Sequence, residues 1–113
     1  MKTYKQFHGE ILISDIGKEL RTIAKREKSD FKIMTGYGSL SGTSQSKIAA
    51  IKSLSKMKKE GLIKDFFPGE VKSQVLLPTS QYYEVKLTYE KQIKSDSDYG
   101  NDGIIFVFLR WQL

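Results

Sequence analysis

The sequence predicts an α/β fold, a two-layer sandwich in which about four strands pack against two or three helices. Along the chain, segments that alternate apolar and polar residues, as strands do, are interspersed with segments that have the apolar spacing of amphipathic helices. A continuous apolar run, IIFVFL at residues 104–109, is typical of a central strand covered on both faces. The 113 residues suffice for one ordinary domain, so we assign residues 1–113 to a single domain.

The first half of the chain predicts two strands, each followed by a helix. Residues 3–11 supply a first extended segment, and residues 31–34 (FKIM) show the alternation of a short half-buried strand. Ser14 or Asp15 begins the first helix. The apolar stripe of that helix is Ile16, Leu20, Ile23 and Ala24, and a second helix over residues 44–60 is expected to bury Ile48, Ile51 and Leu54, with Ala50 and Met57 along one side.

The second half of the chain adds a strand, a third helix and the closing strand. Residues 62–67 predict a strand that a turn at Pro68 ends. Residues 82–93 fit both a strand alternation and a helical apolar face, and we favour the helix because Thr79 or Ser80 can cap it.

The acidic segment 95–103 (SDSDYGNDG) predicts a loop whose side chains bond to the backbone in turns. Its Asp96, Asp98 and Asp102 could also be taken for a cation site. Their spacing differs from that of a calcium loop, however, and the Glu that closes such a loop is missing. We therefore assign no metal to these residues.

Composition limits the possible functions. Lys and Arg outnumber Asp and Glu by 19 to 13, which gives a net charge of +6 and favours polyanionic partners. The chain has no cysteine and one histidine, so disulfides, thiolate nucleophiles and Cys-based zinc sites are excluded. No apolar run has the length of a signal peptide or a membrane span, so we expect a cytoplasmic protein without a membrane partner.

A glycine-rich loop, TGYGSLSG at residues 35–42, joins the second strand to the second helix, and Thr43 or Ser44 is expected to cap that helix. Unpaired amides of such a loop and the positive end of the helix dipole can hold a phosphate. The alternative is that the glycines only permit a tight connection. The residues expected to contact nucleic acid here are Thr35, Gly36, Tyr37, Gly38, Ser39, Thr43 and Ser44, with Tyr37 either stacking on a base or packing on the sheet edge.

Three lysines of the second helix extend this predicted site. Lys52, Lys56 and Lys59 stand at i, i+4 and i+7 and therefore share one face. They are either a solvated face that complements the helix dipole or a row of contacts to phosphates.

Taken together, KIMTGYGS, a capped helix, IKDFFPGE and a final GIIFVFL resemble the Smr (small MutS-related) domain. The resemblance covers residues 4–109 and implies a fold similar to the C-terminal domain of translation initiation factor 3. It also implies binding of DNA or RNA, with nicking endonuclease activity in some members. Residues 71–98 are an insertion relative to the family pattern.

One departure from the family concerns catalysis. Phe7-His8-Gly9 corresponds in part to the family motif Leu-Asp-x-His-Gly, but Gln6 stands where the family has its acidic residue. His8 is the catalytic candidate, since it is the one side chain that titrates near neutral pH. The alternative is a histidine hydrogen-bonded at the end of a strand without a catalytic task.

Three functions remain open. The favoured one is a nucleic-acid-binding module that uses the glycine-rich loop and the basic helix. The second is a nicking nuclease in which Mg²⁺ or Mn²⁺ assists His8 together with Asp30 or another carboxylate. The third is a protein-interaction domain that uses the aromatic insertion at residues 82–89.

Overall fold

The computed structural model describes residues 1–36 and 44–109. Its four-stranded sheet is formed by β1 (Lys2–Tyr4), β2 (Phe31–Met34), β3 (Asp65–Pro68) and β4 (Ile104–Phe108). The helices are α1 (Ile16–Arg26), α2 (Gln45–Lys59) and α3 (Tyr83–Ile93), with short 3₁₀ helices η1 (Ile13–Asp15) and η2 (Gly69–Ser73).

The strands lie in the order β1-β2-β4-β3. β1 runs parallel to β2, and α1 makes the connection between them. β4 runs antiparallel to both of its neighbours, with Ile105 opposite Ile33 on one side and Pro68 on the other. All five residues of β4 are buried, which confirms that the apolar run near the end of the chain is the central strand.

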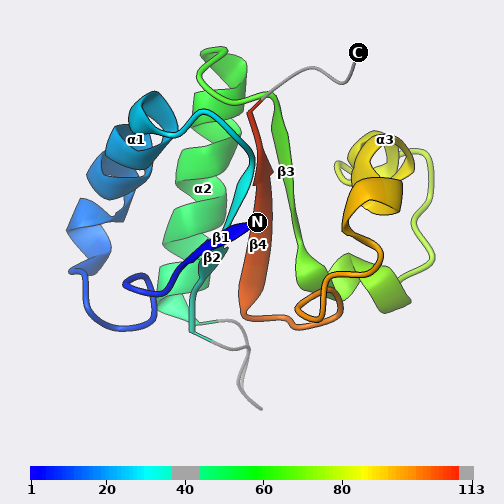
Figure 1. The fold of residues 1–113 in the computed structure, drawn as a ribbon, viewed down its shortest axis with the longest axis horizontal. Helices are drawn as coiled ribbons and strands as arrows, with labels where there is room; N and C mark the ends of the chain where they lie inside the picture. Colours follow the sequence, from blue (N-terminus) through cyan, green and yellow to red (C-terminus); the bar gives the residue numbers. More distant parts are fainter. Residues whose placement is uncertain (37–43, 110–113) are drawn as a thin grey trace.

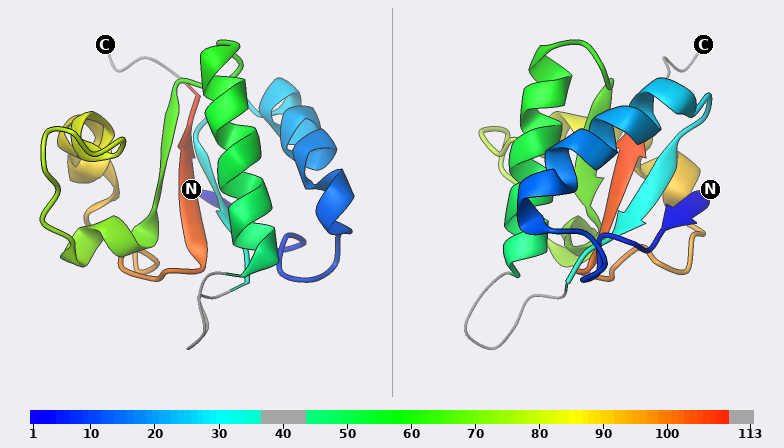
Figure 2. Two further views of the ribbon diagram at one scale, coloured as in Figure 1. Left: turned by 180° about the vertical axis from the view of Figure 1, so that it is seen from behind. Right: turned by 90° about the vertical axis from the view of Figure 1, so that its left-hand side faces the viewer.

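Helices cover both faces of this sheet. α1 and α2 lie side by side on one face, and α3 lies on the other (Figures 1 and 2). The sheet with α1 and α2 forms the predicted two-layer sandwich, and α3 and η2 add cover on the second face. The predicted mixture of about four strands and three helices is therefore confirmed.

The alternation of each strand decides which side chains meet which helices. Phe31, Ile33 and Ile105 belong to the core under α1 and α2. Phe106 and Phe108 belong to the core under α3. One sheet therefore serves two separate apolar clusters, as the two-residue period of its strands requires.

The predicted stripe of α1 is confirmed, but that of α2 is wrong in part. All four predicted residues of α1 are buried. In α2, Ala50, Leu54 and Met57 are buried as expected, whereas Ile48 is 49% exposed and Lys47 is 3% exposed. The helix turns Lys47 inward because Glu70 of η2 accepts a hydrogen bond from its ammonium group, a partner that apolar periodicity cannot detect.

The chain after β3 departs from the expected simple turn. Pro68 is the last residue of β3, where an edge strand tolerates the missing N–H. Gly69 then begins η2, and a Cβ added there would lie 2.4 Å from the backbone oxygen of Asn101. Glycine therefore lets η2 pack directly against the loop before β4.

The prediction of a helix at residues 82–93 is confirmed. α3 buries Val85, Tyr89 and Ile93, the face that the helical interpretation required. Tyr89 stacks on Phe108 of the central strand, with ring centroids 4.0 Å apart. Ser80 Oγ accepts a hydrogen bond from the Tyr82 N–H at 3.2 Å just before the helix begins.

Candidate functional site

The predicted loop site is described at its two ends. Thr35 and Gly36 follow β2, and Ser44 precedes α2. The predicted contacts Tyr37, Gly38, Ser39 and Thr43 lie outside the described residues.

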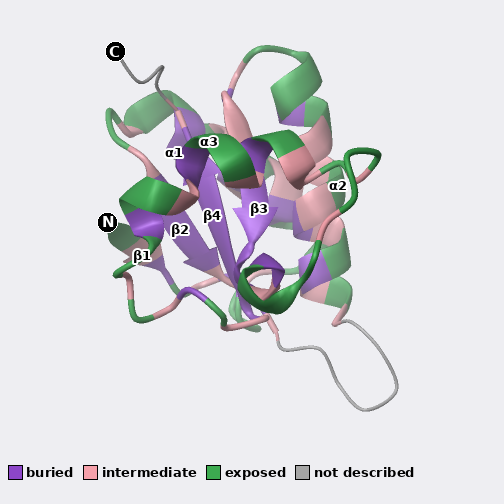
Figure 3. Ribbon diagram, turned by 90° about the vertical axis from the view of Figure 1, so that its right-hand side faces the viewer, coloured by how far each residue is buried: buried purple, intermediate pink, exposed green. Residues whose placement is uncertain are grey.

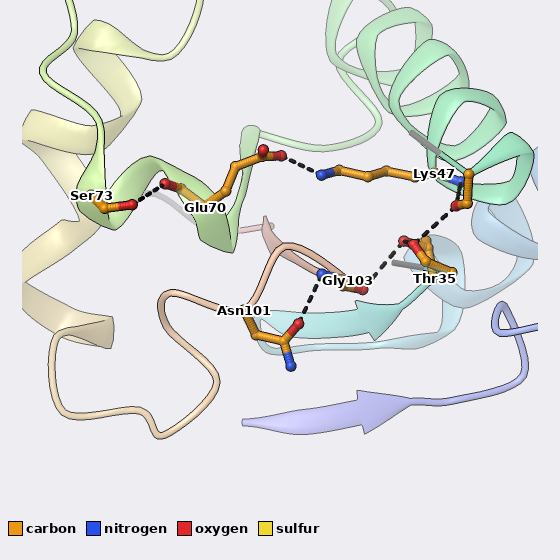
Figure 4. A network of polar contacts seen from close by, with 8 residues as sticks. Thr35, Lys47, Glu70, Ser73, Asn101 and Gly103 are labelled. Atoms are coloured by element: carbon orange, nitrogen blue, oxygen red, sulfur yellow. Dashed lines mark hydrogen bonds and ion pairs between the residues drawn. The ribbon is translucent and has the colours of Figure 1, made fainter. Parts of the chain in front are cut away.

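Thr35, one of the residues predicted to contact nucleic acid, is buried in the structure. Thr35 is 0% exposed, and its backbone N–H donates to the Gly103 oxygen at 2.7 Å. Its hydroxyl lies 3.2 Å from the same oxygen. Thr35 therefore connects the end of β2 to the residue before β4 through hydrogen bonds (Figure 4). Sequence patterns do not reveal such a contact between distant residues.

Gly36 and Ser44 bond to each other and to the first turn of α2. Ser44 Oγ donates to the Gly36 oxygen at 2.9 Å and accepts the Lys47 N–H at 3.2 Å. The Gly36 N–H donates to Ser46 Oγ at 2.9 Å. A Cβ on Gly36 would lie 2.8 Å from the Ser44 Cβ. The Gly36 amide is thus used within the protein, and Ser44 caps the helix as predicted.

His8 lies beside this part of the chain. His8 and Gly9 line a hollow of about 280 Å³ together with Gly36. The other lining residues are Ile11, Ile13, Ser44, Gln45 and Ser46. Two segments that are far apart in the sequence, and that carry the resemblance to the Smr domain, therefore share one hollow.

The residues of this hollow do not fit Mg²⁺ or Mn²⁺. Those ions prefer carboxylate oxygens, and none of the described lining residues has a carboxylate. Within residues 1–36 and 44–109 no group of three or more His, Cys, Asp and Glu side chains could hold a metal. Asp30, the proposed partner of His8, lies at the other end of β2, where it accepts the Leu109 N–H at 2.6 Å and a Gln92 side-chain N–H at 3.1 Å.

The three predicted lysines of α2 lie where the sequence places them. Lys52, Lys56 and Lys59 are all exposed, on the side of the helix that faces away from the buried Leu54. None of the described residues forms an ion pair with Lys52 or Lys56. Their charges are available to a ligand.

A basic groove between α1 and α2 continues this face. The groove has a volume of about 510 Å³ and is lined by four cationic side chains from the two helices, together with Gly17, Thr22 and Ser53. The cations are Lys18, Arg21, Lys25 and Lys56. We call these four the groove cations. A Cβ on Gly17 would lie 2.9 Å from Ser53 Oγ, so glycine keeps the two helices close at this point.

One carboxylate balances part of this charge. Arg21 Nη2 donates to Glu60 Oε2 at 3.2 Å across the two helices. That hydrogen bond, aided by the nearby positive charges and opposed by partial desolvation, holds the pKa of the exposed Glu60 carboxyl below its usual value. Lys18 and Lys25 have no ion-pair partner among the described residues.

Sequence reasoning missed the α1 half of the groove. Lys18, Arg21 and Lys25 stand at i, i+3 and i+7, the same one-face spacing that identified the lysines of α2. The pattern was detectable, but only the packing of α1 against α2 brings the two rows together.

On the other face of the sheet, a buried lysine has its partners inside the protein. Lys32 of β2 is 7% exposed, and its ammonium group lies 2.8 Å from Asp96 and 2.8 Å from Asp98. Burial alone would lower the pKa of Lys32, but the hydrogen bonds to these carboxylates outweigh it and raise that pKa. Two of the aspartates that could suggest a cation site therefore neutralise a lysine of the same chain.

The Asp96 carboxylate also orders its own loop. Its Oδ1 accepts the Asp98 N–H at 2.9 Å, and Asn101 Oδ1 accepts the Gly103 N–H at 2.8 Å. These bonds confirm the prediction of turns closed by side chains.

A second internal ion pair joins Lys47 to Glu70 (Figure 4). The Lys47 side chain is 4% exposed and that of Glu70 is 36% exposed, so the pair connects the first turn of α2 to η2 with the lysine buried and the carboxylate partly exposed. Glu70 is the last residue of the segment IKDFFPGE, which carries part of the resemblance to the Smr domain. The contact with Lys47 gives this residue a structural role.

Two tyrosines of the aromatic insertion pack against the sheet. Tyr89 is 4% exposed. Tyr82 packs edge-on against Phe66 with ring centroids 5.9 Å apart, and burial raises its pKa to about 12. These two tyrosines cover apolar side chains of β3 and β4, and the protein-interaction function stays a prediction.

Comparisons of the chain with protein-family models, with curated proteins and with solved structures found no match. The similarity to the Smr domain, and through it to the C-terminal domain of initiation factor 3, therefore stays a prediction. Among the described residues, no helix has the length and apolar character to cross a membrane.

Proposed function

We propose that this chain binds nucleic acid, DNA or RNA, by placing backbone phosphates along the basic groove between α1 and α2. The observation that carries the proposal is the convergence of the four groove cations on one hollow. Lys52 and Lys59 on the exposed side of α2 extend the same cationic surface.

The electrostatics favour a polyanion over a small acidic ligand. The net charge of +6 attracts phosphates at long range, and each lysine that meets a phosphate releases a counterion. The groove is lined mainly by flexible lysines, which act as point charges without a fixed donor geometry. Such a surface suits a repeating phosphate backbone and predicts little discrimination between base sequences.

The groove supports this function better than the glycine-rich loop does. At the described ends of the loop, the Gly36 N–H and the capping oxygen of Ser44 are already bonded within the protein. The groove lysines, by contrast, have no ion-pair partner among the described residues.

The test compares two pairs of lysines that remove equal charge from opposite sides of the molecule. The groove variant is Lys25→Gln/Lys56→Gln, and the control is Lys72→Gln/Lys94→Gln on η2 and after α3, where both lysines are exposed. Fluorescence anisotropy with labelled single-stranded and duplex oligonucleotides gives the Kd. Losing two phosphate contacts is expected to weaken binding roughly ten- to a hundredfold at about 0.1 M salt, and the control changes the Kd by less than about threefold.

Equal losses in both variants would mean that only net charge matters and would contradict a site at the groove. Absence of binding by the unaltered protein at low salt would reject the function itself.

A further inference from the structure

The outer side of α3 is exposed and lies on the opposite side of the sheet from α1 and α2 (Figures 1 and 3). Val75 is 97% exposed, and Leu87 is 67% exposed. Leu77, in the same connection as Val75, is 68% exposed. Apolar side chains grouped in this way on a surface mark a site of protein association.

The surface contains a preformed hollow. Val75, Leu76, Tyr83 and Leu87 line a hollow of about 300 Å³ with Gln74, Lys86 and Glu90. The Lys86 ammonium group holds its two walls together, since it donates to the backbone oxygens of Val71 at 2.7 Å and Gln74 at 3.1 Å. The connection before α3 is thereby fastened to the helix, and a projecting Val75 stands at the edge of a hollow.

The charges along α3 identify the partner. Glu84 and Lys91 are exposed and share a helix face with Leu87 and Thr88. Glu84 stands three residues before Leu87, and Lys91 stands three residues after Thr88. In an antiparallel pair of α3 helices centred between Leu87 and Thr88, each Glu84 faces the Lys91 of the other copy.

We propose that the partner is a second copy of this chain, bound through antiparallel α3 helices about a two-fold axis. Such an interface is self-complementary, because the same surface of each copy meets its counterpart. The two basic grooves remain exposed on the outer sides of the dimer. The proposal is independent of nucleic-acid binding.

Sedimentation velocity over a range of protein concentrations tests the dimer. The unaltered chain is expected to shift from a species of 12.9 kDa to one of twice that mass as concentration rises. Leu87→Glu is expected to weaken dimerisation by roughly a hundredfold or more, because two carboxylates would be buried without partners. The matched control is Leu12→Glu, since Leu12 is a similarly exposed leucine at 71% on another part of the surface.

Charge reversal tests the antiparallel arrangement. Glu84→Lys alone and Lys91→Glu alone each place like charges opposite one another, and each is expected to raise the dimer Kd by about tenfold. The double variant Glu84→Lys/Lys91→Glu restores opposite charges across the axis and is expected to return the Kd to within about threefold of the original.

A chain that stays monomeric at every concentration would overturn the proposal, as would equal effects of Leu87→Glu and Leu12→Glu. If the double variant dimerised more weakly than either single variant, the antiparallel pairing would be overturned. Binding of a different protein at this surface by a monomeric chain would replace the second copy as its occupant. Because nucleic-acid affinity is measured separately, failure here leaves the groove untouched.

Discussion

The two faces of the sheet share the same strands but differ in what some of their lysines contact. On the α3 face, Lys32 points inward to Asp96 and Asp98, and Lys86 donates to backbone oxygens of Val71 and Gln74. On the α1 and α2 face, the lysines of the groove point outward, and no described carboxylate pairs with them. The inward lysines stabilise the fold, whereas the charges of the outward lysines are available to a ligand.

This difference has a measurable consequence. Substituting an inward lysine or its partner is expected to change the free energy of unfolding, because a buried charge then loses its partner. Substituting an outward lysine is expected to leave that free energy within about 0.5 kcal/mol and to change binding instead.

The largest expected effect concerns the aromatic packing under α3. Phe108 is 0% exposed, stacks on Tyr89 and lies edge-on to Phe67 at 5.4 Å. Phe108→Ala is expected to lower the free energy of unfolding by about 3–5 kcal/mol through lost burial and a cavity. Urea denaturation measures it, with Leu54→Ala as the matched core substitution on the other face. A loss below about 1 kcal/mol for Phe108→Ala alone would show that the α3 face contributes little to the cooperative unit.

The next effect concerns the inward lysine. Asp96→Asn leaves Lys32 with one carboxylate and removes a charged acceptor, so we expect a loss of about 2 kcal/mol in the free energy of unfolding. Lys32→Met is the informative companion, since it removes the buried charge and keeps an apolar stem. Lys32→Met is expected to lower the free energy of unfolding by less than Asp96→Asn does. The opposite order in urea denaturation would contradict a role for Asp96 as the partner of a buried charge.

The same ion pair predicts how stability depends on pH. Burial would raise the pKa of Asp96, but the hydrogen bond from Lys32, the Asp98 N–H and the Lys32 charge together lower that pKa in the folded protein. A lowered carboxyl pKa stabilises the fold above about pH 4, its unfolded value, and this stabilisation is lost as pH falls through the folded value. The raised pKa of Lys32 acts in the opposite sense, stabilising below about pH 10 and losing effect as pH rises further.

The measurement is the free energy of unfolding at a series of pH values for the unaltered chain and for Asp96→Asn. The loss of stability between about pH 4 and pH 2 is expected to be smaller in Asp96→Asn, because the titrating carboxyl is gone. Identical pH dependence in the two proteins would exclude Asp96 as a contributor.

The smallest expected effect is that of His8→Ala. His8 is exposed, and its hollow lacks carboxylates among the described residues, so we expect neither Mg²⁺- nor Mn²⁺-dependent nicking of supercoiled plasmid by the unaltered chain. Retardation of the plasmid in a gel is expected to be the same with and without His8. Metal-dependent conversion to the open circle that disappears in His8→Ala would instead establish a nuclease.

The sequence was most informative where apolar periodicity decides the structure. The stripe of α1 follows from spacing and the central strand at residues 104–108 from a continuous apolar run, because both patterns encode burial. The buried face of Val85, Tyr89 and Ile93 is one of the two that spacing allowed. The exposed face of Lys52, Lys56 and Lys59 follows from the same geometry.

Sequence reasoning failed where a polar residue finds its partner far along the chain. Lys47 replaces Ile48 on the buried side of α2 because Glu70 lies 23 positions away in sequence and pairs with it. Thr35 is buried because Gly103, 68 positions away, accepts its hydrogen bond. The α1 half of the groove has the same origin, since tertiary packing places Lys18 and Lys25 opposite Lys56.

The most direct test of a groove that binds phosphates is the dependence of nucleic-acid affinity on salt. We expect log Kobs to fall linearly with log salt, because each lysine that contacts a phosphate of duplex DNA releases about 0.9 of a counterion. In Lys25→Gln/Lys56→Gln the slope is expected to be shallower by about 2, and in Lys72→Gln/Lys94→Gln it is expected to match that of the unaltered chain. Equal slopes in all three proteins would contradict the assignment of the phosphate contacts to the groove.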